Sequence, residues 1–178
     1  MTRFFYRNSV AAFVEEDANS ILGKLASENS FDLVDQQRNS WVYEIELLKR
    51  LLAHESDGEI VFEYSIPRLG KRIDVALLLH GIIFVLEFKV GADDYYRADV
   101  EQVWDYALDL KNFHEASKNA VIVPILVATD APESSTTQDF SVYDDLVFEP
   151  VMSTMPAIRR RRTPKATRPP SLWQSPYR

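Results

Sequence analysis

Apolar residues follow two kinds of pattern along this chain, and together they predict an α/β protein. The helical pattern is clearest in a stripe formed by Trp41, Ile45, Leu48 and Leu52. Helical spacing predicts helices over residues 9–26, 36–54 and 98–115, with a break at 31–35. Short runs rich in Val, Ile, Leu and Phe predict strands over 60–66, 72–79, 82–90 and 120–128, and more weakly over 142–151.

The order of these elements separates a central domain from two flanking segments. Residues 36–150 hold a helix, a three-stranded meander, a second helix and a strand, which we interpret as one domain. Residues 1–35 are interpreted as an N-terminal helical extension. Residues 151–178 contain four consecutive arginines and many prolines without apolar periodicity, so this basic tail is expected to be disordered or extended.

The second and third predicted strands are separated only by His80 and Gly81, which predicts a β-hairpin. With these two residues as the turn, Asp74 lies directly opposite Glu87, where facing Cβ atoms are roughly 4.5–5.5 Å apart. Lys89 is two residues beyond Glu87 and shares its face. The register therefore gathers two acids and a lysine in strands that are otherwise apolar.

This cluster is the candidate catalytic site. Charges among apolar side chains are costly unless they are paired or bound to a metal, and carboxylate oxygens suit Mg²⁺. Water bound to such an ion can attack a phosphodiester, while Lys89 orients that water or stabilises charge on the phosphorane. The alternative is a structural ion pair of Lys89 with Asp74 or Glu87; all three residues in this register favour the metal site.

Glu44 is a candidate fourth member of the cluster. It lies inside the apolar stripe of the helix predicted over 36–54, whereas Glu46 lies almost opposite, on the solvent side. From the buried face, Glu44 can reach the same metal. A half-exposed Glu44 that pairs with Arg72 explains the spacing equally well.

Polar and aromatic residues near the third helix are candidates for contacting nucleic acid. Gln102 and Tyr106 are four residues apart and therefore adjacent on one helix face, where Gln can hold a phosphate and Tyr can stack or donate a hydrogen bond. Tyr96 and Arg97 place an aromatic ring beside a cation, which suits single-strand stacking. Ordinary packing explains each of these pairs as well.

Asp74, the run Glu87-Phe88-Lys89 and the following Gln102-x-x-x-Tyr106 resemble motifs of the PD-(D/E)XK nuclease superfamily, in the branch of RecB-type and Cas4-type exonucleases. The resemblance implies a restriction-endonuclease-like αβββαβ core with a mixed central sheet flanked by helices. One departure is Ile73, at a position where the family often has proline.

The same resemblance assigns roles to the candidate residues. Lys89 would be the catalytic lysine, and Glu44 matches the family's first-helix glutamate. The implied ligands of Mg²⁺ or Mn²⁺ are Asp74, Glu87, Glu44 and the backbone carbonyl of Phe88. The resemblance implies that Gln102 and Tyr106 position DNA or order the site. Arg72, Tyr96 and Arg97 are expected to contact nucleic acid as well, independently of the resemblance.

Four longer runs are similar to the N-terminal part of bacterial proteins in which a nuclease-like domain precedes a superfamily-one helicase of the Schlafen group-three kind. They are FEYSIPRLGKRIDV from Phe62, FVLEFKVG from Phe84, QVWDYALDLKNFH from Gln102 and VPILVAT from Val123. This chain has no P-loop motif, so the partner that the resemblance implies is a superfamily-one helicase domain that is missing from this chain. The resemblance implies DNA repair or defence against foreign DNA.

Composition narrows the setting without deciding the function. The net charge is −7, but residues 151–178 carry seven basic residues and no acid, which leaves 13 basic and 27 acidic residues, or −14, elsewhere. An acidic body suits divalent cations better than unspecific phosphate binding. The absence of cysteine excludes disulfides and thiolate metal sites. Without a bilayer-spanning run or a signal peptide, a cytoplasmic protein is expected.

Three interpretations follow from the sequence. The first is a Mg²⁺-dependent deoxyribonuclease, with RNA as an open alternative substrate, and the set of Asp74, Glu87, Lys89, Gln102 and Tyr106 favours it. The second is an inactive nucleic-acid-binding or protein-docking module with the same fold. The third is a fragment that folds poorly without a partner domain.

Overall fold

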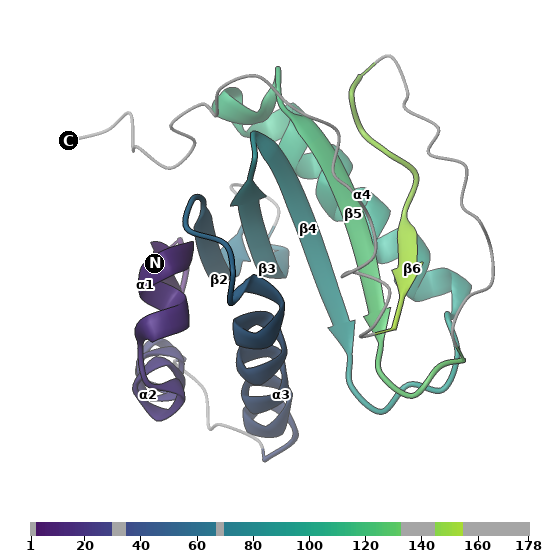
Figure 1. The fold of residues 1–178 in the computed structure, drawn as a ribbon. Helices are drawn as coiled ribbons and strands as arrows, with labels where there is room; N and C mark the ends of the chain where they lie inside the picture. The colour runs from purple at the N-terminus through teal and green to yellow at the C-terminus, as the bar shows by residue number, and fades with distance from the viewer. Residues whose placement is uncertain (1–2, 30–34, 67–69, 133–144, 155–178) are drawn as a thin grey trace.

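The strands line up in one sheet in the same order as they occur along the chain (Figure 1). Neighbours from β1 to β4 are antiparallel, whereas β4, β5 and β6 run parallel to one another, so the sheet is mixed. The computed structural model describes residues 3–29, 35–66, 70–132 and 145–154. The six strands are β1 (Tyr6–Ser9), β2 (Glu59–Ser65), β3 (Arg72–Leu79), β4 (Ile82–Lys89), β5 (Val121–Ala128) and β6 (Val151–Ser153).

Helices cover both faces of this sheet. Two apolar clusters fill the layers: one joins α1, α2 and α3 to the sheet, and the other joins α4 to the opposite face. The predicted α/β class is therefore confirmed, and no described helix is long and apolar enough to cross a membrane. The helices are α1 (Val10–Glu15), α2 (Ala18–Glu28), α3 (Asp35–Leu52) and α4 (Arg97–Phe113), followed by the short 3₁₀ helix η1 (Glu115–Ser117).

The single helix predicted over 9–26 is wrong, because the chain breaks between α1 and α2. Asp17 is extended, and its carboxylate accepts the backbone N–H groups of Asn19 and Ser20 at 3.0 and 3.1 Å. Aspartate side chains compete with helical hydrogen bonds in this way and so favour a cap over a helix interior. Apolar spacing continues across the break, which is why periodicity alone did not reveal it.

Lys49 of α3 donates hydrogen bonds to backbone carbonyls at the end of α1. Its Nζ donates to the carbonyls of Phe13 and Val14 at 2.8 and 2.6 Å, and also to the carbonyl of Glu16. The same ammonium group stands 5.4 Å from the centre of the Phe13 ring. The last carbonyls of a helix have no partner within it, so a cation from α3 supplies the missing donors.

Strand β1 was not predicted, because its four residues, Tyr-Arg-Asn-Ser, carry no apolar alternation. It nevertheless pairs with β2, from Tyr6 opposite Phe62 to Ser9 opposite Glu59. Tyr6 is buried, and its ring packs edge-on against the rings of Phe13 and Phe62. The segment interpreted as a helical extension therefore contributes an edge strand as well as two helices.

The β3–β4 hairpin has the predicted register. His80 and Gly81 have φ angles of 52° and 80°, as a type I′ turn requires, and Leu79 pairs with Ile82. The ladder continues as far as Val75 opposite Leu86.

Pro124 lies inside β5, which has neighbours on both sides. Two residues earlier, the Ile122 N–H donates to Leu146 on the β6 side, so Pro124 faces that side as well. Pairing is interrupted there, between the Ile122–Val147 bridge and the Ile125–Val151 pair. The missing proline N–H therefore removes no ladder bond.

The predicted boundary at residue 150 lies just before the last strand. Residues 151–153 of the predicted tail form β6 against β5, and Thr154 is buried. Of the strand predicted over 142–151, the structure describes 145–151, where Val147 bridges Ile122 ahead of β6. The remainder of the tail, 155–178, lies outside the described residues.

Replacement of Lys49 with Met tests the link between α3 and α1. The variant leaves three carbonyls without their charged donor, so we expect the free energy of unfolding to fall by about 2–3 kcal/mol in urea denaturation. Arg50→Met is the control, since Arg50 is the exposed neighbour on the same helix. Equal losses in the two variants would contradict the assigned role of Lys49.

Candidate functional site

Strands β2 and β3 each reverse the face of the sheet to which their side chains point, and they do so at positions opposite each other. Phe62 and its partner Val75 pack under α1–α3, whereas the next pair, Tyr64 and Ile73, packs under α4. Residues two apart normally share a face, so each strand must reverse its faces at the residue between. Those two residues are Glu63 and Asp74, and Glu63 has a φ of 54°, a conformation that costs about 1–3 kcal/mol outside glycine.

Asp74 lies where β3 and β4 part. The paired register ends at Val75 and Leu86, and the next position would set Asp74 opposite Glu87, as the sequence predicts. The carboxylate of Asp74 instead reaches across and accepts the backbone N–H of Phe88 at 2.8 Å. A side chain thus takes the place of a ladder partner and keeps the end of the hairpin closed.

Glu87, Lys89, Gln102 and Tyr106 form one hydrogen-bonded chain between β4 and α4. Lys89 Nζ donates to Glu87 Oε1 and to Gln102 Oε1, both at 3.1 Å. The Gln102 amide donates to Glu87 Oε1 at 3.0 Å and to the Tyr106 hydroxyl at 2.7 Å. The spacing of Gln102 and Tyr106 therefore places both residues against the predicted acid and lysine.

Asp99 belongs to this chain and was missed from the sequence. Its Oδ1 lies 3.2 Å from Lys89 Nζ, so the ammonium group has three acceptors from two elements. Asp99 stands in the first turn of α4, three residues before Gln102 and therefore on the same helix face. That spacing was the available signal, but an acid in a first helical turn is also common for reasons of the helix dipole.

Glu44 points into the interior from α3. Its side chain is buried, at 3% exposure, whereas Glu46 on the other side of the helix is exposed. Ser40 donates to Glu44 Oε1 at 2.7 Å, and Oε2 has no hydrogen-bond partner. The alternative of a half-exposed Glu44 paired with Arg72 is therefore wrong.

Arg72 pairs with Glu63 instead, the second residue that sequence reasoning missed. The nearest distance in this pair is 3.4 Å, and Glu63 also accepts the indole N–H of Trp41 at 2.8 Å. The Arg72 guanidinium lies 4.3 Å from the centre of the Phe5 ring. Glu63 sits opposite Asp74, but the five-residue link before β3 did not allow that register to be calculated.

The acids affect one another electrostatically. Burial raises the pKa of Asp74 well above its usual range, and the charges of Glu87 and Glu44 raise it further. Burial raises the pKa of Glu44 to about 8, with Glu63 and Glu87 adding to the effect. Burial likewise raises the pKa of Glu87, although Lys89 opposes the shift. The site therefore holds protons that a cation can replace.

Lys89 remains a cation in this setting. Burial opposes its charge, yet the carboxylates of Glu87 and Asp99 raise the pKa of Lys89 above its ordinary value. An ammonium group that is held charged donates hydrogen bonds and stabilises negative charge, and it does not accept a proton.

The donor set fits a hard divalent cation. Among the residues that the structure describes, Glu44 Oε2 and Glu87 Oε2 are buried oxygens without a hydrogen-bond partner, and unsatisfied carboxylate oxygens are the groups that Mg²⁺ binds. In this structure the hydrogen bond from Ser40 orients the Glu44 side chain, and those from Lys89 and Gln102 orient the Glu87 side chain. Across the ranges that the structure describes, no three His, Cys, Asp or Glu side chains are grouped as a metal site requires.

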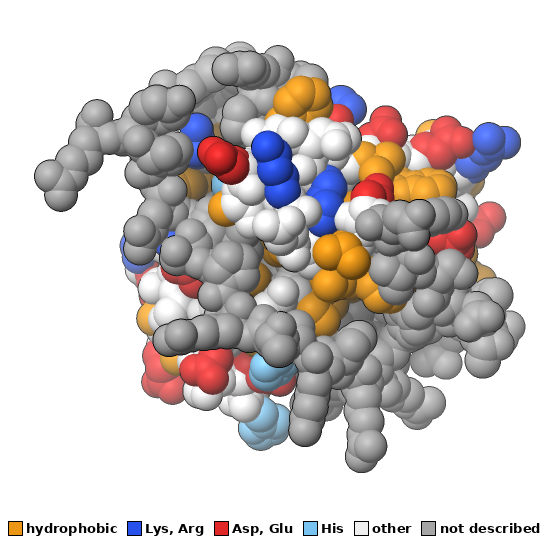
Figure 2. Space-filling model, turned by 90° about the horizontal axis from the view of Figure 1, so that it is seen from above, with side chains coloured by type: hydrophobic (Ala, Val, Ile, Leu, Met, Phe, Trp, Pro, Cys, Tyr) orange, Lys and Arg blue, Asp and Glu red, His pale blue; other side chains and the backbone are white. Residues whose placement is uncertain are grey.

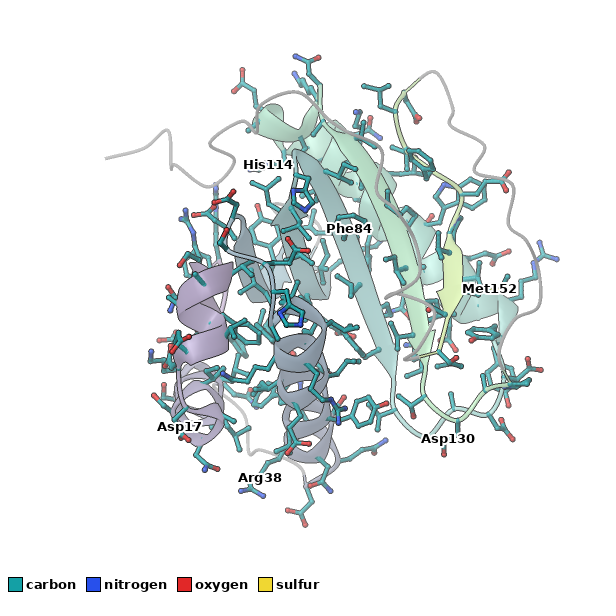
Figure 3. All side chains as sticks on the ribbon, viewed as in Figure 1. Asp17, Arg38, Phe84, His114, Asp130 and Met152 are labelled. Atoms are coloured by element: carbon teal, nitrogen blue, oxygen red, sulfur yellow. The ribbon has the colours of Figure 1, made fainter. Side chains whose placement is uncertain are left out.

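Tyr96 and Arg97 stand apart from this cluster. Both are exposed, and they bond locally: the Tyr96 hydroxyl donates to Asp93 at 3.0 Å and Arg97 Nε donates to Glu101 at 2.7 Å. Tyr96 caps α4 and Arg97 begins it, at the end of the molecule where β4 and β5 finish, the end marked by Asp130 in Figure 3. Figure 2 looks onto the opposite end, where acidic, basic and hydrophobic side chains are interspersed over the described surface.

Comparison of the chain with models of protein families, with curated proteins and with solved structures found no match.

The raised pKa of Glu44 predicts how stability depends on pH. Between its ordinary pKa of 4.5 and about 8, the folded state keeps a proton that the unfolded state releases, so stability falls as the pH rises through this window. Without divalent cations, Glu44→Gln is expected to exceed wild type at pH 8 by about 2 kcal/mol in urea denaturation, and by less near pH 4.5. Glu46→Gln, on the exposed side of α3, should follow wild type; a pH-independent gap for Glu44→Gln would contradict the shift.

Proposed function

We propose that this protein is a Mg²⁺- or Mn²⁺-dependent nuclease that hydrolyses DNA phosphodiester bonds, with the PD-(D/E)XK arrangement of residues. The observation that carries the proposal is the hydrogen-bonded chain of Glu87, Lys89, Gln102 and Tyr106 beside the buried acids Asp74 and Glu44. A structural ion pair of Lys89 and Glu87 needs neither the glutamine nor the two further acids.

The order of elements also supports the proposal. From α3 to β5 the chain runs helix, three antiparallel strands, helix and parallel strand, the order expected of an αβββαβ nuclease core. In that arrangement the acids come from the middle strands and the first helix, and the glutamine and tyrosine come from the second helix. Here Asp74 and Glu87 lie on β3 and β4, Glu44 lies on α3, and Gln102 and Tyr106 lie on α4, which supports the proposal.

Each side chain has a part in the proposed reaction. Asp74, Glu87, the Phe88 carbonyl and Glu44 would hold the cation, with the acids turning their free oxygens toward it. A bound Mg²⁺ or Mn²⁺ activates water and neutralises charge on the phosphate. Lys89, kept charged by Glu87 and Asp99, orients the attacking water or stabilises the phosphorane. Gln102 and Tyr106 hold Lys89 and Glu87 in position.

A second candidate is an inactive module that binds nucleic acid or docks a protein with the same fold. The observation in its favour is that no described group of three acids is arranged for a metal, while Lys89 is tied to three acceptors. The two candidates differ in one property: only the nuclease must bind a divalent cation at Asp74. The proposed setting for either is DNA repair or defence, alongside a superfamily-one helicase, in the cytoplasm.

Cleavage of end-labelled DNA tests the nuclease directly. With Mg²⁺ or Mn²⁺, wild type should cut single- or double-stranded DNA, and Lys89→Ala should be slower by about 10²–10³-fold, since it loses a group that stabilises the transition state. Lys118→Ala, an exposed lysine after η1, should cleave as wild type does. A folded wild type that cuts neither DNA nor RNA under these conditions would favour the inactive module.

Cation binding gives a readout that does not depend on cleavage. Mg²⁺ at about 100 times its dissociation constant should stabilise the folded protein by about 2.7 kcal/mol, visible as a rise in Tm. Asp74→Asn should abolish this rise, because it removes a charged ligand, whereas Asp57→Asn in the turn before β2 should keep it. An equal Tm rise in both variants would place the cation elsewhere.

A further inference from the structure

Glu63 is the feature of the site that the proposed chemistry leaves unexplained. Among the described residues outside glycine, three have a positive φ, and Glu63 is the one that lies inside a strand. Glu63 is buried, at 5% exposure, and its charge raises the pKa of the neighbouring acids Glu44 and Asp74. Strained backbone and buried charge persist only where the surrounding structure holds them, and both are frequent at functional sites.

The two oxygens of the Glu63 carboxylate have different partners. Oε1 accepts the Trp41 indole N–H at 2.8 Å and the Gln37 amide at 3.4 Å, which ties the carboxylate to α3. Oε2 faces Arg72, whose Nη1 lies 3.4 Å away. The first oxygen therefore anchors the side chain to the core, and the second is left to orient a cation at the surface.

Arg72 is held from two sides and still faces solvent. Its guanidinium lies over the Phe5 ring and against Glu63, yet 41% of its side chain is exposed. A guanidinium has five donors in a rigid plane, and the Glu63 contact engages one of its nitrogens. The geometry leaves the remaining donors available to an external acceptor, two residues before Asp74.

Other cations near the site are more fully paired. Lys89 has three acceptors, and Lys71 lies between Asp105 and Asp109. Arg72 has one carboxylate partner, at the long distance of 3.4 Å, and that carboxylate is shared with α3. An acidic protein that binds a polyanion needs a cation whose position is set in advance.

We propose that Glu63 is a positioning residue that holds Arg72 beside the acid cluster, where the guanidinium binds a backbone phosphate of the nucleic-acid strand. This inference rests on the proposed function for its ligand, but it concerns binding and not the hydrolytic step. Glu63 acts through Arg72, and the positive φ at residue 63 is what turns its carboxylate out of the regular strand alternation toward α3 and Arg72.

The direction in which Glu63→Gln changes the affinity for DNA separates a positioning role from a purely electrostatic one. Removing a negative charge beside a polyanion should strengthen binding if Glu63 acts only through its charge. If Glu63 positions Arg72, Glu63→Gln should weaken binding. Glutamine has a single acceptor oxygen, and with that oxygen on the Trp41 indole N–H its NH2 group would face the guanidinium in place of Oε2. We expect weakening by about tenfold, and a similar loss for Arg72→Gln.

Binding of a fluorescent single-stranded DNA by the full chain in EDTA, at several salt concentrations, measures these effects. Arg72→Gln should also reduce the slope of log affinity against log salt by about 0.7, the value for one phosphate contact with a single strand. The double variant, Glu63→Gln with Arg72→Gln, should bind DNA no more weakly than Arg72→Gln alone, since Glu63 acts through Arg72. Arg72→Lys should recover only part of the affinity, because lysine lacks the planar fork.

Three further variants guard against misfolding and unspecific effects. Glu63→Gly removes the carboxylate while glycine adopts the positive φ without strain, so it should fold and bind as weakly as Glu63→Gln. The matched control is the Arg7–Glu59 pair, 2.8 Å apart and about 13 Å along β2 from Glu63. Arg7→Gln and Glu59→Gln should leave the salt slope unchanged.

The outcomes distinguish this inference from the nuclease itself. Unchanged or tighter binding by a folded Glu63→Gln, or additive losses in the double variant, overturns the positioning role even if wild type cleaves DNA. No binding of DNA by wild type at any salt concentration also overturns it. Weakened, non-additive binding supports the role, including in a wild type that binds DNA but does not cut it.

Discussion

The carboxylate of Asp74 accepts the Phe88 N–H at the point where β3 and β4 separate, and the geometry of the site depends on this contact. It keeps the end of the hairpin together after the paired register stops. It also brings the ionisable carboxyl group of Asp74 close to Glu44, Glu63 and Glu87, where burial disfavours the charged form. The fold therefore concentrates acids at one level of its sheet and offsets their repulsion through protons and hydrogen bonds.

The same level of the sheet is where two strands reverse their faces. The reversal at Glu63 and Asp74 moves these acids out of the regular alternation that fills the two apolar layers. On both sides of this level the strands pack into the apolar layers, with Phe62 and Val75 under α1–α3 and Tyr64 and Ile73 under α4. Core residues therefore flank Glu63 and Asp74 along both strands, and their packing holds the strained backbone at residue 63 in place.

The two helices that border the site act on it differently. Helix α3 contributes buried groups with few alternatives: Glu44, and the Trp41 indole N–H bonded to Glu63. Helix α4 contributes Asp99, Gln102 and Tyr106, which hold Lys89 and Glu87 through a partly buried network. Helix α3 thus supplies a buried acid, and α4 supplies side chains that hold Lys89.

The sequence alone determined the α/β class, the hairpin register and the grouping of Asp74, Glu87 and Lys89, because periodicity and a two-residue turn are local constraints. It left Glu44 open between a buried and a half-exposed position, and the structure shows it buried. The sequence did not reveal β1, the break at Asp17, or the places of Glu63 and Asp99 in the cluster. The break at Asp17 is local, but apolar spacing that continues across it concealed it. The others depend on partners from other elements: β2 for β1, Trp41 and Arg72 for Glu63, and Lys89 for Asp99. Tertiary structure decided them, since only folding brings such groups within hydrogen-bond distance.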